Sequence, residues 1–427
     1  MDSLASRTYQ NVFIESKEEL KNILQNINGK SIIVAYIDID NFKYINDIYG
    51  YEIGDRIIIN LGLKLIDIGK GSFEVFKLNA DEFILVFKNY SMNRVTKIID
   101  KVIKICKELY IFEMKEIITN ISVGIYEVQT KEELNEILRK AELAMHFSKI
   151  NGKSRFTIYT KEIEEYMKRK TRLIIELKKA INNDEFYVLY QPIYNLKEKK
   201  IKKVEALARW KNDTLGEVSP AEFIPVLEEL GMINEFGILI VEKIFKQIKK
   251  WKEDNLDINV NINISPLQLK YFHKNGELNI LKDRYQIDFK RITFELTEGQ
   301  LKDLDEEDKN TLMGLKEMGA KISLDDFGRG YSQLFNLFTL PINEIKVDRD
   351  IIKSIEDDYR TRKMLECFIR LTKEFGYDIV GEGVETKSQL ILLNEMGCNC
   401  IQGYYISKPI SGAEVLDLVN KNTLIEV

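Results

Sequence analysis

The stretch KISLDDFG, residues 321–328, joins an apolar run to two adjacent carboxylates. Its alternating apolar side chains predict a β-strand, and Asp325 and Asp326 stand at the carboxyl end of that strand. Seven other segments repeat this arrangement of a strand-like run with a polar residue at its end. They are YVLYQPIYN (187–195), KVEALARW (203–210), INVNINIS (258–265), RITFELTE (291–298), EIKVDRD (344–350), DIVGEGVE (378–385) and CIQGYYIS (400–407).

Helical patterns separate most of these strands, for example at residues 220–252, 306–318 and 359–375. Eight strands with intervening helices over about 260 residues are typical of a (β/α)8 barrel. The first two strands are separated only by LKEKK (196–200), which is too short for a helix. We therefore expect an α/β fold, a TIM-like barrel with one antiparallel strand where these two segments form a hairpin.

The polar residues at the strand ends predict one shared site, because the carboxyl ends of barrel strands meet at one mouth. In chain order they are Gln191, Glu205, Asn263, Glu295, Asp325, Asp326, Lys346, Glu382 and Gln402. Taken singly, each residue is equally well explained as a solvated strand end. Taken together, the carboxylates would repel each other unless cations were bound between them. An all-oxygen ligand set favours Mg²⁺ or Mn²⁺, and two adjacent aspartates allow two ions, an arrangement that cleaves phosphoesters.

The composition disfavours several other classes of function. The 427 residues include 63 Lys and Arg against 68 Asp and Glu, and this near balance disfavours binding to a nucleic-acid polymer. The four cysteines form no CxxC pair and only two histidines occur, which disfavours disulfide scaffolds and ordinary zinc sites. No apolar run approaches the roughly 18 residues of a membrane span, and MDSLASRTYQ (1–10) lacks a signal-peptide core. We therefore expect a cytoplasmic protein without a membrane anchor.

The first part of the chain predicts a separate domain of mixed α/β structure. Strand patterns alternate there with helical patterns, at SIIVAYIDID (31–40), SFEVFKL (72–78), EFILVFK (82–88) and IITNISVGIYE (117–127). We expect a helical lead-in at residues 1–29, too short for a sensor domain, and a domain at 30–160. The charged stretch 161–181 lacks Gly and Pro and predicts a connecting helix. That helix runs into the barrel domain at 170–427 and is equally well described as its first helix.

Motifs in the second domain resemble those of the EAL-domain phosphodiesterases, which hydrolyse cyclic di-GMP to linear pGpG. They are EALARW (205–210), NISPLQL (263–269), ELTE (295–298), DDFGRGYS (325–332), KVD (346–348), EGVET (382–386) and QGYYISKP (402–409). The motifs follow the family's order, and the resemblance extends over residues 170–420. It implies a metal-dependent cyclic di-GMP phosphodiesterase, and it suggests a homodimer.

The resemblance also implies a role for each matching residue. The implied metal ligands are Glu205, Asn263, Glu295, Asp325, Asp326 and Glu382. Lys346 would act at the catalytic water, beside the catalytic carboxylates Glu205, Asp325, Asp326 and Glu382. Glu298 would support the loop of residues 325–329. The implied substrate contacts are Gln191, Arg209, which would contact a phosphate, and Gln402.

Two residues of the second domain depart from the family pattern. Ala208 replaces the usual leucine, and we expect this change to be mild. Arg329 replaces the usual threonine in the loop that links the metal site to the dimer contact. The effect of this long cationic side chain on the turnover rate stays open, although the change removes no metal ligand.

Motifs in the first domain resemble the GGDEF domain of diguanylate cyclases, which has a nucleotidyl-cyclase-like fold. They are DIDNFKYIND (38–47), YGYEIGD (49–55), NADEF (79–83), ISVG (121–124) and AELAMHFSKINGKSRF (141–156). The resemblance implies a nucleotide site formed by Asp38, Lys43, Asn46, Asp55, Asp81, Glu82 and Lys149. Asp38 and Glu82 would bind metal. Asn46 and Asp55 would contact guanine, and Lys43 and Lys149 would contact the phosphates.

The signature turn of this first domain departs from the family pattern, because Asn79 and Ala80 stand where the family has two glycines. Glycine lets backbone amides approach nucleotide phosphates, and larger residues intrude on that space. We therefore expect little or no cyclase activity in a degenerate GGDEF domain. The domain would either bind GTP as a regulator of the hydrolase or serve only in packing. Two alternatives for the chain remain open: a non-catalytic cyclic di-GMP receptor, and a bifunctional cyclase and phosphodiesterase.

Overall fold

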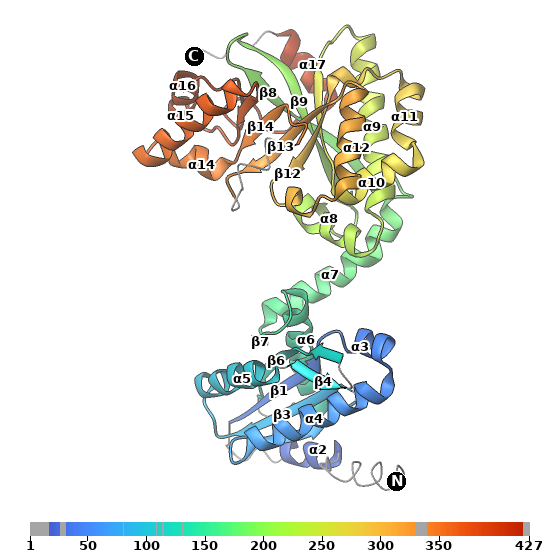
Figure 1. Ribbon diagram of the computed structural model, residues 1–427, viewed down its shortest axis with the longest axis vertical. Helices are drawn as coiled ribbons and strands as arrows, with labels where there is room; N and C mark the ends of the chain where they lie inside the picture. Colours follow the sequence, from blue (N-terminus) through green and yellow to red (C-terminus); the bar gives the residue numbers. More distant parts are fainter. Residues whose placement is uncertain are drawn as a thin grey trace. The chain divides into compact units, whose positions relative to one another are not determined.

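The computed structural model describes residues 17–25, 31–79, 81–107, 109–112, 115–129, 132–329 and 340–421. The chain forms two compact units, Met1–Arg172 and Leu173–Val427 (Figure 1). The division between them falls within α7 (Lys161–Ala180), where the charged stretch predicts a helix. Each unit has its own hydrophobic core.

The first unit is built on a five-stranded sheet with β1 at its centre (Figure 1). Its strand order is β2 (Glu74–Lys77), β3 (Glu82–Lys88), β1 (Ile32–Ile39), β6 (Ile121–Glu127) and β7 (Phe156–Ile158). β6 and β7 run parallel, and the other neighbours run antiparallel. A separate antiparallel pair is formed by β4 (Leu109–Phe112) and β5 (Lys115–Ile118).

Helices cover both faces of this sheet, and β1 is therefore buried along its whole length. The described helices are α2 (Lys17–Gln25), α3 (Phe42–Tyr49), α4 (Tyr51–Gly69), α5 (Met92–Cys106) and α6 (Leu134–Ile150). Because side chains alternate along a strand, Ile33 and Ala35 pack with α4 and α5, whereas Val34 and Tyr36 pack with α2 and α6. The unit has the mixed α/β fold that the sequence predicts.

The second unit is a closed barrel of eight strands, as predicted. In spatial order they are β9 (Lys200–Asn212), β11 (Asn259–Asn263), β12 (Ile292–Thr297), β13 (Lys321–Phe327), β14 (Glu344–Val347), β15 (Asp378–Gly381), β16 (Cys400–Gln402) and β8 (Phe186–Asn195). β8 pairs antiparallel with both β9 and β16, and this pairing closes the barrel. The predicted hairpin is confirmed. A short strand, β10 (Gly216–Val218), pairs antiparallel with the last residues of β9.

Helices surround the barrel between its strands (Figure 1). The described ones are α8 (Pro220–Glu229), α9 (Ile233–Glu253), α10 (Pro266–Asn275), α11 (Glu277–Tyr285), α12 (Glu306–Glu317), α14 (Arg349–Ser354), α15 (Tyr359–Glu374), α16 (Lys387–Glu395) and α17 (Gly412–Asn420). The helical stretch expected at 220–252 consists of two helices, α8 and α9, because Gly231 has a φ of 69° and separates them. None of the described helices combines the length and apolarity needed to cross a membrane.

Candidate functional site

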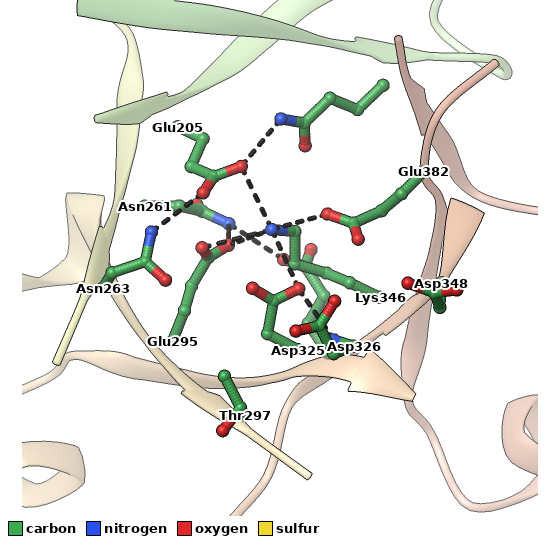
Figure 2. A network of polar contacts seen from close by, with 12 residues as sticks. Glu205, Asn261, Asn263, Glu295, Thr297, Asp325, Asp326, Lys346, Asp348 and Glu382 are labelled. Atoms are coloured by element: carbon green, nitrogen blue, oxygen red, sulfur yellow. Dashed lines mark hydrogen bonds and ion pairs between the residues drawn. The ribbon is translucent and has the colours of Figure 1, made fainter. Parts of the chain in front are cut away.

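Lys346 lies at the centre of a group of carboxylates inside the barrel (Figure 2). It belongs to β14, whose four residues are all buried, and its side chain is only 1% exposed. Its ammonium nitrogen lies close to the carboxylates of Glu205 (3.1 Å), Glu295 (3.1 Å), Asp325 (3.2 Å) and Glu382 (2.7 Å). Residues separated by up to 177 positions in the sequence therefore meet around one buried cation.

Burial and neighbouring charges together shift the pKa values of these groups. Burial lowers the pKa of Lys346, but the surrounding carboxylates outweigh it and hold that pKa well above its ordinary value. Burial raises the pKa of Glu295, and the negative charge of Glu205 raises it further. Burial also raises the pKa of Glu382 to about 8, although Lys346 acts against this shift. One ammonium group therefore leaves excess negative charge that further cations can offset.

The carboxylates form two triplets that share Asp325. One triplet is Glu205, Glu295 and Asp325, and the other is Asp325, Asp326 and Glu382, each with oxygens within 4.8 Å of one another. We call these five residues the acidic cluster. A φ of 55° at Asp326 turns the backbone sharply between the two adjacent aspartates. Two overlapping oxygen triplets suit a pair of Mg²⁺ or Mn²⁺ ions that share a carboxylate ligand.

Three amide side chains lie beside Glu205. The Asn263 amide donates to Glu205 Oε1 at 2.8 Å, and the Gln402 amide donates to Oε2 at 2.7 Å. Gln402 also donates to Gln191 Oε1 at 3.1 Å. The expectation that Gln191 ends its strand is wrong, because β8 runs antiparallel and brings Gln191 beside Glu205 from mid-strand. Both oxygens of Glu205 are thus held in place.

The loop after β13 is held by contacts on both sides. The Gly328 amide donates to Glu298 Oε2 at 2.9 Å, which is the contact that a loop-supporting role for Glu298 requires. Arg329 is 61% exposed, and its guanidinium lies 3.5 Å from Asp326 and 3.2 Å from Asp348. The remainder of the expected DDFGRGYS motif, residues 330–332, lies outside the described residues.

Two clefts open beside the acidic cluster, and Glu205 lines both. The first has a volume of about 490 Å³, and its polar lining includes Gln191, Gln402 and Arg349. The second has a volume of about 400 Å³. Its lining is mainly apolar and includes Leu207, Pro220, Ile224, Phe236 and Ile240. Arg209 also lines this cleft. The acidic cluster therefore lies beside both clefts, with Asp325, Asp326 and Glu382 lining the first and Glu295 lining the second.

Sequence reasoning missed three polar residues beneath the acidic cluster: Asn261 and Glu344, which are buried, and Lys203, whose side chain is 12% exposed. The Asn261 amide donates to Glu295 at 2.8 Å and to Glu344 at 3.1 Å, and Lys203 forms an ion pair with Glu344. The sequence indicates these residues, because side chains two positions apart on a strand share a face and each of the three stands two positions before a predicted site residue.

In the first unit, part of the expected nucleotide site comes together. Asp38 lies opposite Glu82 in the register of β1 and β3, and Lys149 forms a 2.5 Å ion pair with Asp38. Burial raises the pKa of Asp38, while its contact with Lys149 lowers it. Burial likewise raises the pKa of Asp81 in the adjoining turn. In that turn the Asn79 amide donates to Glu82, whereas Ala80 lies outside the described residues.

The other expected nucleotide contacts lie on α3 and α4. Lys43 and Asp55 are exposed, and Asn46 is half-buried. Asn46 lies so close to Gly54 that a Cβ at position 54 would stand 1.9 Å from Asn46 Oδ1. Within the described part of the chain, no hydrogen bond or ion pair joins these residues to Asp38 or Glu82.

The family model described as the EAL domain matches residues 175–409. The chain belongs to the EAL domain family. A second model, described as the diguanylate cyclase GGDEF domain, matches residues 9–155, so the two domains stand in tandem. The EAL domain is the barrel described above, and the GGDEF domain is the first unit.

Curated proteins resemble the chain over both domains. Signaling protein YkoW of Bacillus subtilis is 31% identical over 88% of this chain and 48% of its own length. Cyclic di-GMP phosphodiesterase PdeR of Escherichia coli is 27% identical over 92% of this chain and 59% of its own length. MucR of Pseudomonas aeruginosa, named a bifunctional diguanylate cyclase and cyclic di-GMP phosphodiesterase, is 27% identical over 91% of this chain and 57% of its own length. The chain thus spans about half the length of the curated relatives it matches.

A solved structure, described as the PaMucR phosphodiesterase in complex with c-di-GMP, resembles the EAL domain. It is 29% identical to this chain, with a TM-score of 0.54, and the match covers 57% of this chain and 99% of that one. The likeness supports the barrel fold and its assignment to the EAL domain family.

Proposed function

We propose that the EAL domain hydrolyses cyclic di-GMP to linear pGpG with the aid of two Mg²⁺ or Mn²⁺ ions. The observation that carries this proposal is the acidic cluster, whose two oxygen triplets share Asp325 and surround Lys346. No residue type that the family resemblance requires at these positions has been replaced. The PdeR and MucR names and the c-di-GMP complex of PaMucR support the choice of substrate.

The residues of the site divide the work of hydrolysis between them. Glu205, Glu295, Asp325, Asp326 and Glu382, with the Asn263 amide, would hold the metals. Bound divalent cations would supply the positive charge that activates water and stabilises the phosphate in the transition state. The ammonium group of Lys346 lies among these carboxylates, where it would donate a hydrogen bond to the attacking water or offset developing negative charge. Water would add to phosphorus while the bond from phosphorus to one ribose 3′-oxygen breaks, and the proton that the water loses would end on that oxygen.

The two clefts match the two halves of a cyclic dinucleotide. A scissile phosphate at the acidic cluster would leave one guanosine beside the polar cleft and the other beside the apolar cleft. Gln191 and Gln402 line the polar cleft and offer amide donors and acceptors. Arg209 lines the apolar cleft, where its guanidinium can bind a phosphate oxygen. Apolar walls suit the face of a purine base.

A direct assay tests this proposal on the full chain. Cyclic di-GMP is incubated with the protein and Mg²⁺ or Mn²⁺, and pGpG is quantified by chromatography. We expect conversion with either ion and none after chelation of the metal. Binding of cyclic di-GMP without conversion, at high protein concentration and with both ions, would instead support the receptor alternative.

For the GGDEF domain we propose GTP binding without synthesis of cyclic di-GMP. Asp38, Glu82 and Lys149 lie together and can contact a metal–phosphate group. In the signature turn the Asn79 side chain donates to Glu82 and occupies space that a glycine would leave open. Cyclase activity is the second candidate, since MucR is named bifunctional. Turnover of GTP by Glu205→Gln protein, whose phosphodiesterase is disabled, would decide between them.

We expect GTP to change the apparent affinity of the EAL domain for cyclic di-GMP. By linkage, cyclic di-GMP must then change the affinity for GTP by the same factor, which calorimetry measures in both directions. Asp38→Asn is expected to weaken GTP binding by about tenfold, because it removes a buried carboxylate whose loss costs on the order of 1–2 kcal/mol. Asp100→Asn on α5 removes an exposed carboxylate as a control. A protein that binds no GTP would leave this domain with a structural role.

We also propose that the protein is a homodimer. Exposed apolar side chains form a stripe that includes Met364 and Leu371 on α15 and Phe375 directly after it. Such a stripe on a surface helix is typical of a protein contact. On the same helix Phe368 stacks on Phe327, at 4.4 Å between ring centroids, beside the loop that follows β13. Sedimentation analysis of the full chain tests the dimer.

Arg329→Thr is expected to tighten Mn²⁺ binding by about two- to fivefold at low ionic strength. The guanidinium now pairs with Asp326, a proposed metal ligand, and exposed ion pairs of this kind contribute up to about 1 kcal/mol. Calorimetric titration measures the change, and added salt should reduce it. Arg360→Thr, at an exposed position on α15, is the matched control. Equal Mn²⁺ affinity in both variants would contradict competition between Arg329 and the metal.

A further inference from the structure

A second polar layer lies inside the barrel beneath the acidic cluster. Its members alternate with the residues of the site, two positions apart on the same strands and therefore on the same face. The pairs are Lys203 and Glu205 on β9, Asn261 and Asn263 on β11, and Glu344 and Lys346 on β14. None of the three lower residues belongs to the oxygen triplets of the acidic cluster.

Asn261 joins this lower layer to the acidic cluster (Figure 2). Its side chain is fully buried, and its amide nitrogen donates to Glu295 Oε1 at 2.8 Å and to Glu344 Oε1 at 3.1 Å. An amide nitrogen carries two hydrogens, so each carboxylate receives one. Both hydrogens of the amide are used, and Glu295 is held from the side opposite the mouth.

Glu344 determines which end of the Asn261 amide faces the acidic cluster. A charged carboxylate accepts hydrogen bonds only, so the nitrogen end must lie between Glu344 and Glu295. The rotated amide would direct its carbonyl oxygen at two carboxylates. Lys203 forms an ion pair with Glu344, and their side chains are 12% and 2% exposed. This neutral pair keeps Glu344 ionised inside the barrel and unavailable to a metal.

We propose that Asn261 and Glu344 are positioning residues for the metal centre, with Lys203 as the counter-ion that keeps Glu344 charged. They hold Glu295 in the orientation in which it completes its oxygen triplet. The inference rests on the proposed function, because it takes the acidic cluster to be the metal site. Hydrogen bonds to ligating carboxylates typically contribute about 10- to 100-fold in metal affinity or activity.

Asn261→Ala tests the inference most directly, since it removes the bridging amide and leaves the Lys203–Glu344 pair intact. Mn²⁺ binding to the full chain is measured by electron paramagnetic resonance in an Asp38→Asn background, which excludes the candidate site of the GGDEF domain. We expect Mn²⁺ affinity in the barrel to fall about 10- to 100-fold. In the hydrolysis assay at fixed Mn²⁺, kcat should fall while the KM for cyclic di-GMP stays within about twofold. Glu344→Gln should produce the same pattern.

A double variant separates positioning from a merely structural role. Glu344→Gln leaves Lys203 buried without its partner and should lower the urea midpoint of the barrel. The two tryptophans, Trp210 and Trp251, are both buried in this unit, so their fluorescence reports its unfolding alone. Lys203→Met combined with Glu344→Gln removes both charges, and we expect the midpoint to recover while Mn²⁺ affinity stays low. Lys202→Met, one residue along β9, is the control, because Lys202 is 44% exposed and pairs with Glu198.

Wild-type Mn²⁺ affinity in Asn261→Ala, or its return in the double variant, would overturn the inference. Failure of Glu344→Gln to fold leaves the decision to Asn261→Ala, in which no charge is unpaired. The proposed function fails separately, when wild-type protein binds Mn²⁺ but converts no cyclic di-GMP. The Mn²⁺ comparison then still decides whether Asn261 and Glu344 position the acidic cluster.

Discussion

Glu205→Gln is expected to abolish hydrolysis of cyclic di-GMP while the barrel stays folded. Glu205 belongs to one oxygen triplet, and its two oxygens accept hydrogen bonds from Asn263, Gln402 and Lys346. Glutamine keeps the shape of the side chain but loses the charge. Its NH₂ group would face N–H groups of Asn263, Gln402 or Lys346, which are hydrogen-bond donors themselves. Loss of a metal ligand removes several kcal/mol of charge stabilisation, which corresponds to on the order of a thousandfold in kcat.

The measurement is pGpG formation under saturating Mn²⁺ and cyclic di-GMP. Glu253→Gln, which removes an exposed carboxylate at the end of α9, serves as the control and should keep wild-type activity. Tryptophan fluorescence checks that both variants are folded. If Glu205→Gln retained more than about a tenth of the wild-type rate, the acidic cluster would not be the catalytic site.

Lys346→Met is expected to destabilise the metal-free barrel by about 3–5 kcal/mol, the usual cost of removing one partner of a buried ion pair. Four carboxylates lie within 3.2 Å of its ammonium nitrogen, and they would be left to repel each other. Some would take up protons, as the raised pKa values of Glu295 and Glu382 indicate. Mn²⁺ should restore more stability to this variant than to wild type, because the metal supplies the missing positive charge.

Urea unfolding followed by tryptophan fluorescence, with and without Mn²⁺, measures this effect in the barrel alone. Lys353→Met, at an exposed position on α14, controls for the loss of a lysine. An unchanged midpoint in metal-free Lys346→Met would show that Lys346 does not hold the cluster together. Equal stabilisation of variant and wild type by Mn²⁺ would show that the metal does not replace Lys346 in neutralising the carboxylates.

The barrel could be predicted from the sequence because apolar side chains recur at regular positions in its strands and polar residues follow them. Glu205, Asp325 and Glu382 were expected at one mouth, and the fold brings them together around Lys346. The break between α8 and α9 was missed although Gly231 marks it, since the apolar period continues on both sides. The position of Gln191 was misjudged because a polar residue was expected at every strand end, whatever the strand direction.

The arrangement of the residues expected to form a nucleotide site in the GGDEF domain could be predicted less well. Asp38 and Glu82 meet because β1 and β3 pair in the antiparallel register that places these two residues opposite each other. Lys43, Asn46 and Asp55 lie on helices, whose orientation depends on packing against the sheet and not on local sequence. A motif identifies such residues by resemblance but does not determine their distance from the strands.

The sequence by itself determined the order of strands and helices, the tandem of two domains and the concentration of carboxylates at strand ends. Only the tertiary structure decided that Lys346 occupies the centre of those carboxylates and that Asn261 and Glu344 support them from below. The physical reason is the closure of the barrel. Every second side chain of a strand points into the barrel, and closure stacks these side chains into layers across the eight strands. Which side chains meet within one layer depends on the stagger between neighbouring strands and on the direction of each strand.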